Sequence, residues 1–282
     1  MGLRGNLGAL DVSRVGLGAM SLLGVGPQDL DAVLRACVAH GIDWIDTADV
    51  YCTDEGDLGA NERQLGASLR ALGPDAASLR VVTKGGLTRP DGDWGEDASP
   101  ARLRRQCEAS LRNLGVEALP LYQLHAPDPA VPLEESVGAL VRLREEGKIL
   151  GIGLSNVSAD EVARACAVTT IASVQNRASL LAREAWADGV LDACAARGIA
   201  FVAYSPVGGA DRALLHADPV VTAIAARHGL TPEGVALAWL LARAPVLAIP
   251  GASRVETVAS IGRAARVVLD PGELELLDGC TF

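Results

Sequence analysis

The chain has 282 residues, of which 49% are hydrophobic and 21% charged, so it is long enough to bury a sizeable core. Its formal net charge of −10 argues against general binding to nucleic acid or to an anionic membrane surface. Residues 1–18 lack the apolar core of a signal peptide, and no uncharged apolar run is long enough to span a membrane. We therefore expect a cytoplasmic protein with one domain over 1–282.

Short apolar runs alternate with longer helical patterns along the chain, which is typical of parallel strands buried on both faces. Ser99-Pro100 and Thr231-Pro232 predict helix starts, and Ser158 begins a capping-box pattern. Glycines at 41, 147, 198 and 229 mark expected helix ends. In chain order, the expected strands are 15–19, 42–46, 79–84, 119–125, 149–154, 172–175, 199–205 and 246–250.

Eight strands, each followed by a helix, predict a (β/α)8 TIM barrel of the α/β class. A doubly wound sheet is the alternative, but it would carry a phosphate loop such as G-x-G-x-x-G after its first strand. The sequence GLGAM at 16–20 does not match that pattern. The first ten residues are expected to form a short N-terminal hairpin that closes the bottom of the barrel.

Six cysteines stand at 37, 52, 107, 166, 194 and 280, and no pair has the spacing of metal ligands. Most of them lie in apolar helical surroundings, so we interpret them as small, reduced core residues. The sequence therefore predicts neither a disulfide framework nor a metal site.

Polar side chains gather where the expected strands end, which is the functional rim of this fold. Asp46 and Tyr51 follow the second strand, Lys84 ends the third and His125 ends the fourth. Taken alone, each has a structural explanation: a helix cap, a loop anchor, a solvated charge and a satisfied core histidine. Because all four converge on one rim, we expect them to form a site.

These four residue types suit proton donation to a carbonyl group. A phenol has an ordinary pKa of about 10, and an adjacent ammonium stabilises the phenolate and lowers that pKa. A carboxylate paired with Lys84 keeps the lysine charged, and His125 can orient the carbonyl oxygen. The hydride must come from a nicotinamide, because no side chain supplies one.

Seven motifs lie in order along the expected strand ends. They are G-I-D-W-I-D-T-A-D-x-Y at 41–51, V-V-T-K at 81–84, L-Y-Q-L-H at 121–125, E-G-K-I-L-G-I-G-L-S-N at 146–156, V-Q-N at 174–176, V-A-Y-S-P at 202–206 and I-P-G-A-S-R at 249–254. With these motifs the chain resembles the aldo-keto reductase superfamily along essentially its whole length. The resemblance implies an NADP-dependent carbonyl reductase with Tyr51 as general acid, Lys84 and Asp46 tuning it, and His125 orienting the carbonyl.

The resemblance also implies which residues hold the cofactor. Ser155, Asn156 and Gln175 match the positions that bind the nicotinamide carboxamide, and Tyr204 matches the aromatic residue that stacks on the ring. Further implied cofactor contacts are Ala19, Met20, Asp46, Ser205, Pro206, Val207, Ile249 and Gly251.

Ser253 and Arg254 match the family's contacts to the 2′-phosphate of NADPH, and the planar guanidinium fork suits that group. This favours NADPH/NADP+ over NADH; the alternative is that Arg254 is a surface helix residue. Family members commonly have Glu-Asn six and seven residues after this arginine, where this chain has Ser260-Ile261. We therefore expect weaker anchoring of the adenine, with the arginines of 263–266 either compensating or simply solvated.

Loops above the strands are expected to shape the substrate pocket. Its expected residues are Leu22 after the first strand, Cys52 beside Tyr51, and Trp94 in the long connection 85–98. Trp94 either walls the pocket or packs the loop onto the barrel. The stretches at 84–90 and 175–183 resemble a bacterial, pyridoxal reductase-like branch, which usually has an aromatic residue where Ala178 stands. The substrate stays open between pyridoxal, a sugar and a secondary-metabolite ketone.

Two other functions use the same residues. One is a Schiff-base aldolase with Lys84 as nucleophile, which would need a desolvated lysine. The other is a non-catalytic NADPH-binding regulatory subunit, like the channel β-subunits that share this fold; retention of all four site residues weighs against it. The expected partner is a small-molecule carbonyl substrate, with no nucleic acid and no membrane. The oligomeric state, reaction direction and stereochemistry stay open.

Overall fold

The computed structural model describes residues 4–243 and 246–282, and within these ranges eight parallel strands form one sheet. Neighbouring strands follow each other in chain order, so each new strand is added at the same edge. The strands are β3 (Leu17–Gly18), β4 (Trp44–Asp46), β5 (Arg80–Gly85), β8 (Tyr122–Leu124), β9 (Ile152–Ser155), β10 (Ser173–Arg177), β11 (Ala200–Tyr204) and β12 (Val246–Ala248).

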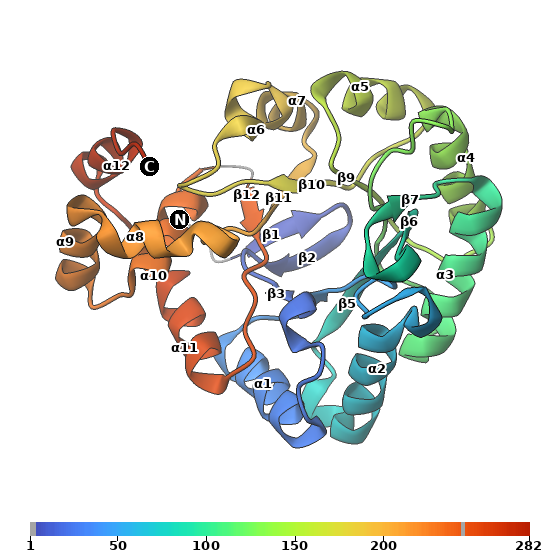
Figure 1. Cartoon of the computed structure of the whole chain (residues 1–282), viewed down its shortest axis with the longest axis horizontal. Coiled ribbons are helices and arrows are strands. Elements are labelled where there is room, and N and C mark those ends of the chain that lie inside the picture. The colour runs from blue at the N-terminus through green and yellow to red at the C-terminus, as the bar shows by residue number, and fades with distance from the viewer. Residues whose placement is uncertain (1–3, 244–245) are drawn as a thin grey trace.

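The sheet closes on itself through contacts between the first and last strand regions. Parallel bridges pair Val15 with Ala248 and Gly18 with Gly251, and the Gly16 N–H donates to the Ala248 carbonyl at 2.9 Å. Helices surround this sheet as an outer ring (Figure 1). The arrangement confirms the predicted (β/α)8 barrel.

The helices begin and end largely where the sequence signals predict. Ser99 caps α3 by accepting from the Arg102 N–H, and Ser158 forms the capping box of α5 with Glu161. Within the described residues the helices are α1 (Pro27–His40), α2 (Ala60–Leu72), α3 (Pro100–Leu114), α4 (Leu133–Glu145), α5 (Ala159–Val168), α6 (Glu184–Ala187), α7 (Val190–Arg197), α8 (Ala213–Ala217), α9 (Pro219–His228), α10 (Pro232–Leu241), α11 (Val255–Ala264) and α12 (Pro271–Asp278). Across these ranges, no helix has the length and apolar character needed to cross a membrane.

Several strands are shorter than predicted. The run 119–125 is a strand only over Tyr122–Leu124, and Leu119 keeps a single isolated bridge to Ile149. Pro120 separates the two parts, and proline cannot donate to the ladder. The connection 85–98 contains an additional antiparallel hairpin, β6 (Leu87–Thr88) and β7 (Gly95–Glu96), which the sequence did not predict.

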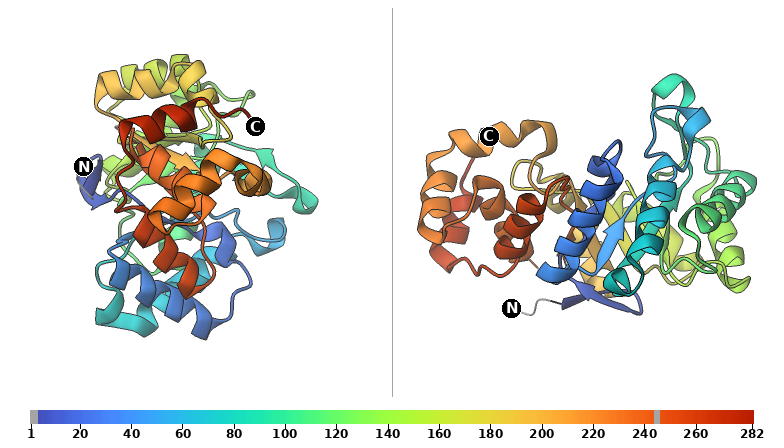
Figure 2. Two further views of the ribbon diagram at one scale, coloured as in Figure 1. Left: turned by 90° about the vertical axis from the view of Figure 1, so that its left-hand side faces the viewer. Right: turned by 90° about the horizontal axis from the view of Figure 1, so that it is seen from below.

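An antiparallel hairpin closes the bottom of the barrel, as predicted, but it reaches Ser13 and so extends beyond the predicted first ten residues. It consists of β1 (Arg4–Leu7) and β2 (Leu10–Ser13); residues 1–3 of the predicted segment lie outside the described ranges. Leu7 and Val12 pack with Trp44 in a buried cluster that also contains Val82, Leu121, Val202 and Leu247 from four other strands or strand approaches. Figure 2 shows the hairpin at one end of the barrel and the β6–β7 connection at the other.

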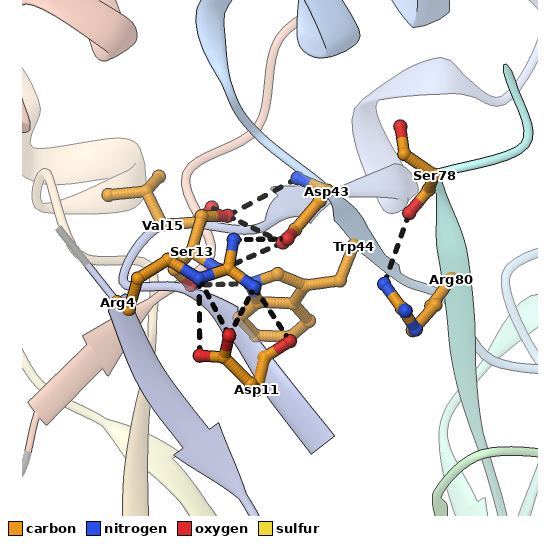
Figure 3. A network of polar contacts seen from close by, with 8 residues as sticks. All are labelled: Arg4, Asp11, Ser13, Val15, Asp43, Trp44, Ser78 and Arg80. Carbon is orange, nitrogen blue, oxygen red and sulfur yellow. Dashed lines mark hydrogen bonds and ion pairs between the residues drawn. The ribbon is translucent and has the colours of Figure 1, made fainter. Parts of the chain in front are cut away.

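A polar network fastens this hairpin to the barrel (Figure 3). The Asp43 carboxylate accepts from the Ser13 backbone N–H at 2.8 Å and from its hydroxyl at 3.0 Å. Arg4 bridges Asp43 and Asp11, and the Trp44 indole N–H donates to the Ser13 carbonyl. The bottom of the barrel is therefore sealed by both apolar packing and hydrogen bonds.

Candidate active site

Successive side chains along each strand point alternately into and out of the barrel. Those that point inward are apolar at the bottom of the barrel and polar at its rim. In β4, Trp44 joins the interior cluster, Ile45 packs outward under the helices, and Asp46 faces inward again. In β5, Val82 occupies the apolar layer and Lys84 follows two residues later. Asp46 and Lys84 thus meet inside the rim because each follows an inward apolar residue by two.

Lys84 contacts two of the other predicted site residues, Asp46 and Tyr51. Its side chain is fully buried, and Nζ donates to the Asp46 carboxylate at 2.5 Å and to the Thr47 carbonyl at 2.9 Å. The third contact is to the Tyr51 hydroxyl at 3.0 Å. All three N–H groups of an ammonium therefore have an acceptor.

The Asp46 carboxylate is held by two glutamines as well as by the lysine. Its second oxygen accepts from the side-chain amides of Gln123 at 3.1 Å and Gln175 at 2.8 Å. The three donors come from β5, β8 and β10, so neighbouring and distant strands converge on one carboxylate. A buried charge with this number of partners has a fixed position.

Burial and charge act in opposite directions on the phenol and the ammonium. Burial raises the pKa of Tyr51 above its usual value, and Lys84 offsets this only in part. Lys84 acts to lower the pKa of Tyr51, as predicted, but desolvation is the larger effect and the pKa is raised overall. Burial also lowers the pKa of Lys84, but Asp46 and Tyr51 outweigh it and the pKa of Lys84 is raised. Both groups keep their protons at neutral pH.

His125 lies next to Tyr51, with the two ring centroids 5.9 Å apart. Burial, and secondarily the Lys84 charge, hold the pKa of His125 well below 6.5. Its Nδ1 is buried and has no hydrogen-bond partner among the described residues. A neutral imidazole carries one N–H, so His125 can donate a single hydrogen bond to an oxygen placed near Tyr51.

Trp94, in the β6–β7 connection, reaches the site from above. Its ring centroid lies 6.5 Å from that of His125, and about half of the residue, 51%, is exposed. The Arg89 guanidinium stacks on the Trp94 ring at 4.2 Å, and the Arg89 backbone N–H donates to Glu55. Trp94 therefore both borders the site and holds the loop together.

Leu22 and Cys52 present little or no surface to a pocket. Leu22 ends the 3-10 helix η1 (Ala19–Leu22), has no exposed surface and packs in the core. Cys52 is buried, its thiol donates to the Val50 and Asp54 carbonyls, and burial raises its pKa to about 11. The sequence expectation for both residues is corrected, because their nearness to the site along the chain does not determine where their side chains lie.

Asn156 ties three strand ends together. Its side-chain amide donates to the His125 carbonyl, and its Oδ1 accepts from the Tyr204 hydroxyl, both at 2.9 Å. Asn156 and Ser205 have φ values of 56° and 49°, a left-handed conformation that residues with a Cβ adopt at a cost and that gathers at functional sites. Ser155 precedes Asn156 at the end of β9 and is buried, whereas Asn156 is exposed. The residues expected to meet a nicotinamide therefore lie on neighbouring strand ends.

A cavity of about 480 Å³ lies beside the rim, between the segments after β11 and β12 and helices α10 and α11. Of the residues expected at the cofactor, Val207, Gly251 and Arg254 line it. Ser253, next to Arg254, is exposed. Arg254 has no side-chain hydrogen bond or ion pair within the described chain, so its guanidinium is available to an anion. This donor set fits a phosphate group.

The other expected cofactor residues differ in exposure. Met20 is 56% exposed at the rim, whereas its neighbour Ala19 is buried. The Ala19 carbonyl accepts from the Asn61 side chain at 3.1 Å. Pro206 and Ile249 are also buried, so any contact they make with a cofactor is through a small exposed area.

Sequence reasoning missed three residues that support the site. Gln123 precedes His125 by two positions, so it points to the same side, and a polar residue in an otherwise apolar strand was the available signal. Asn61 and Glu62 lie on the buried face of α2, where Asn61 accepts from the Thr47 hydroxyl and Glu62 accepts from Thr83, both at 2.7 Å. Both contacts depend on how α2 packs on the strands.

Comparison with known proteins gives consistent results. The family model described as "Aldo/keto reductase family" matches residues 14–281. A pyridoxine 4-dehydrogenase of Escherichia coli is 36% identical over 289 residues, covering 97% of this chain and 96% of that protein. An aldo-keto reductase of Klebsiella pneumoniae, solved in complex with NADPH, is 32% identical with a TM-score of 0.81, covering 95% of this chain and 90% of that one. A glycerol dehydrogenase of Gluconobacter oxydans is 27% identical with a TM-score of 0.83, covering 96% and 91%.

Proposed function

Because the chain belongs to the aldo/keto reductase family, we propose that it reduces an aldehyde or ketone to an alcohol with hydride supplied by bound NADPH and a proton supplied by Tyr51. It is an NADP-dependent oxidoreductase, in keeping with family relatives solved with NADPH or NADP. The assignment of roles depends on one observation: the Lys84 ammonium donates hydrogen bonds to both the Asp46 carboxylate and the Tyr51 hydroxyl.

The geometry supports Tyr51 as the proton donor. Its raised pKa keeps the phenol protonated until a carbonyl oxygen accepts the proton. The Lys84 Nζ, 3.0 Å from the hydroxyl, then stabilises the tyrosinate that forms. Asp46 balances the lysine charge, and neutral His125 donates a hydrogen bond that orients the carbonyl.

The same strand ends would hold the cofactor. Ser155, Asn156 and Gln175 would bind the carboxamide, and Tyr204 would stack on the ring. The Gln175 amide nitrogen donates to Asp46, which leaves its carbonyl oxygen to accept from the carboxamide. Ser253 and Arg254 would bind the 2′-phosphate, next to the cavity that Arg254 lines. Ala19, Met20, Ser205, Pro206, Val207, Ile249 and Gly251 complete the proposed contacts.

The buried lysine argues against the aldolase alternative. A Schiff base forms from an unprotonated amine, whereas the pKa of Lys84 is raised and its ammonium donates to three acceptors. The proposed substrate is a small carbonyl compound that enters beside Trp94. Pyridoxal is a natural first candidate, because a relative with 36% identity is a pyridoxine 4-dehydrogenase.

The test is loss of NADPH absorbance with an activated aromatic aldehyde and with pyridoxal, run beside NADH. Tyr51→Phe should lower kcat roughly 10²- to 10⁴-fold, the range for a general acid. Tyr122→Phe is the matched control, because its hydroxyl is buried without a partner in the described chain. NADPH binding without Tyr51-dependent turnover of any aldehyde would instead favour the non-catalytic subunit.

A further inference from the structure

The cavity beside the rim is lined by three arginines from separate places in the fold. Arg212 ends the 3-10 helix η5 (Gly209–Arg212), Arg254 is the N-cap of α11, and Arg263 lies in the last turn of α11. Figure 1 shows α8, α10 and α11 close together on this side of the barrel. The cavity therefore collects cationic groups that are far apart in the sequence, in a chain whose net charge is −10.

None of these three guanidinium groups has a hydrogen bond or an ion pair within residues 4–243 and 246–282. Other arginines are engaged: Arg243 pairs with Asp278. Arg266, one turn beyond Arg263, donates to the Gly262 and His40 carbonyls at 2.9 and 3.0 Å. Of Arg263 and Arg266, only Arg263 lines the cavity. The structure therefore gives different surroundings to two arginines for which the sequence allowed the same two roles.

Two carboxylates also line the cavity, so its wall carries more positive than negative groups. Glu233 contacts His216 at 2.8 Å, and Glu256 stands in the first turn of α11. Three guanidinium groups therefore face two carboxylates, one of which already has a partner. A ligand with more than one negative group, such as a nucleotide with a ribose phosphate and a pyrophosphate, matches this balance.

Ser260 and Ile261, at the positions where the resemblance places the adenine contacts, carry little that could read a purine edge. Ser260 presents only a short hydroxyl, and Ile261 is 7% exposed and packs into the core. Gly234, Leu237 and Ala264 add small or apolar surface. Adenine is read most specifically by a carboxamide that pairs with its N6 and N7, and no Asn or Gln is among the described residues of this cavity.

We infer that this protein anchors the adenosine end of its cofactor by charge, through Arg212 and Arg263 together with Arg254, and that it does not select the purine base. The inference rests on the proposed use of NADPH. Arg212 and Arg263 thereby become specificity-determining residues for the 2′-phosphorylated dinucleotide. A phosphorylated dinucleotide carrying hypoxanthine in place of adenine should bind equally well.

Selection of the purine base is tested by calorimetric titration of the wild-type protein with NADP+ and with nicotinamide hypoxanthine dinucleotide phosphate. The two Kd values should agree within about threefold, whereas loss of one well-formed bidentate base contact would weaken binding by roughly 5- to 150-fold. A preference for adenine above about threefold would overturn the inference and leave the proposed function intact. Absence of NADP+ binding would refute the proposed function itself.

The arginines are tested with adenosine 2′,5′-bisphosphate, whose binding does not depend on turnover. Arg212→Gln and Arg263→Gln should each raise its Kd, by roughly 10- to 150-fold for charged hydrogen bonds that are fully made. Arg266→Gln, just beyond the end of α11, is the matched control and should leave the Kd unchanged. Thermal unfolding of each variant separates misfolding from lost contacts. Unchanged Kd values in folded Arg212→Gln and Arg263→Gln proteins would overturn the assignment.

Discussion

Replacing Lys84 with methionine is expected to destabilise the protein as well as abolish turnover. The change removes the cation but leaves the Asp46 carboxylate buried, with only the amides of Gln123 and Gln175 as donors. Breaking a buried ion pair by removing one partner costs roughly 3–5 kcal/mol. Because two amide contacts remain, we expect a loss near the lower end, about 3 kcal/mol of unfolding free energy.

The double variant Asp46→Asn/Lys84→Met removes both charges and should recover about 1–2 kcal/mol relative to Lys84→Met, because no uncompensated charge stays buried. Guanidinium unfolding at pH 7 measures all four proteins of the cycle. Arg35→Met breaks an ion pair with Asp75 in which both partners are about half exposed, and it should cost less than about 1 kcal/mol. The reasoning is refuted if Lys84→Met is as stable as Arg35→Met, or if the double variant is less stable than Lys84→Met.

The same contacts predict a pH dependence of stability. The pKa of Lys84 is raised in the folded protein, so its protonated form is favoured by folding. Its stabilisation is fully present below the unfolded pKa of about 10.4 and is lost as the pH rises through the higher folded value. Lys84→Met should therefore flatten the fall in stability on the alkaline side, which unfolding curves above pH 10 would show.

Three other expectations concern neighbouring groups. Because the pKa of His125 is held low and that of Tyr51 is raised, kcat/KM should stay flat between about pH 6.5 and 10; an acid limb with a midpoint near 6.5 would contradict a neutral His125. Asp49 is buried with a pKa well above its usual range, owing to burial and to Glu62. The folded protein therefore loses stability as the pH rises above the unfolded pKa of about 3.9, and the loss is complete once Asp49 also ionises in the folded state. Asp49→Asn should therefore raise the unfolding temperature more at pH 8 than at pH 5. An equal effect at both pH values would contradict a raised pKa for Asp49. Asp43→Ala leaves the Ser13 N–H without its acceptor and should cost about 1–3 kcal/mol in urea unfolding; a neutral result would mean that the hairpin is not held by this carboxylate.

The candidate site at the rim was predictable because side chains alternate with a period of two along each strand. Asp46, Lys84 and His125 end apolar runs, and parallel strands bring their carboxyl ends to one edge. The role of Gln123 was not predictable in the same way, since it depends on the register between β8 and the strands that carry Asp46 and Lys84. Asn61 and Glu62 depend in turn on how α2 packs on the barrel.

The errors have a common cause in side-chain direction and burial. Leu22 and Met20 belong to one short helical turn, yet one is fully buried and the other 56% exposed. Only the three-dimensional course of η1 distinguishes them. The net direction of the Tyr51 pKa shift could not be predicted, because the lysine charge is visible in a sequence whereas desolvation is a property of the packed site.

The seam that closes the barrel also sets a limit on how the chain can fold. The Arg14 guanidinium donates to the Val246 carbonyl, a partner 232 positions away, and Val15 bridges Ala248. Contacts of such long range form slowly, because a long loop must close before they contribute. During synthesis, β3 therefore keeps an unpaired edge until residues 246–251 have left the ribosome. The interval before the seam forms is when the nascent barrel is most exposed to association with other unfinished chains.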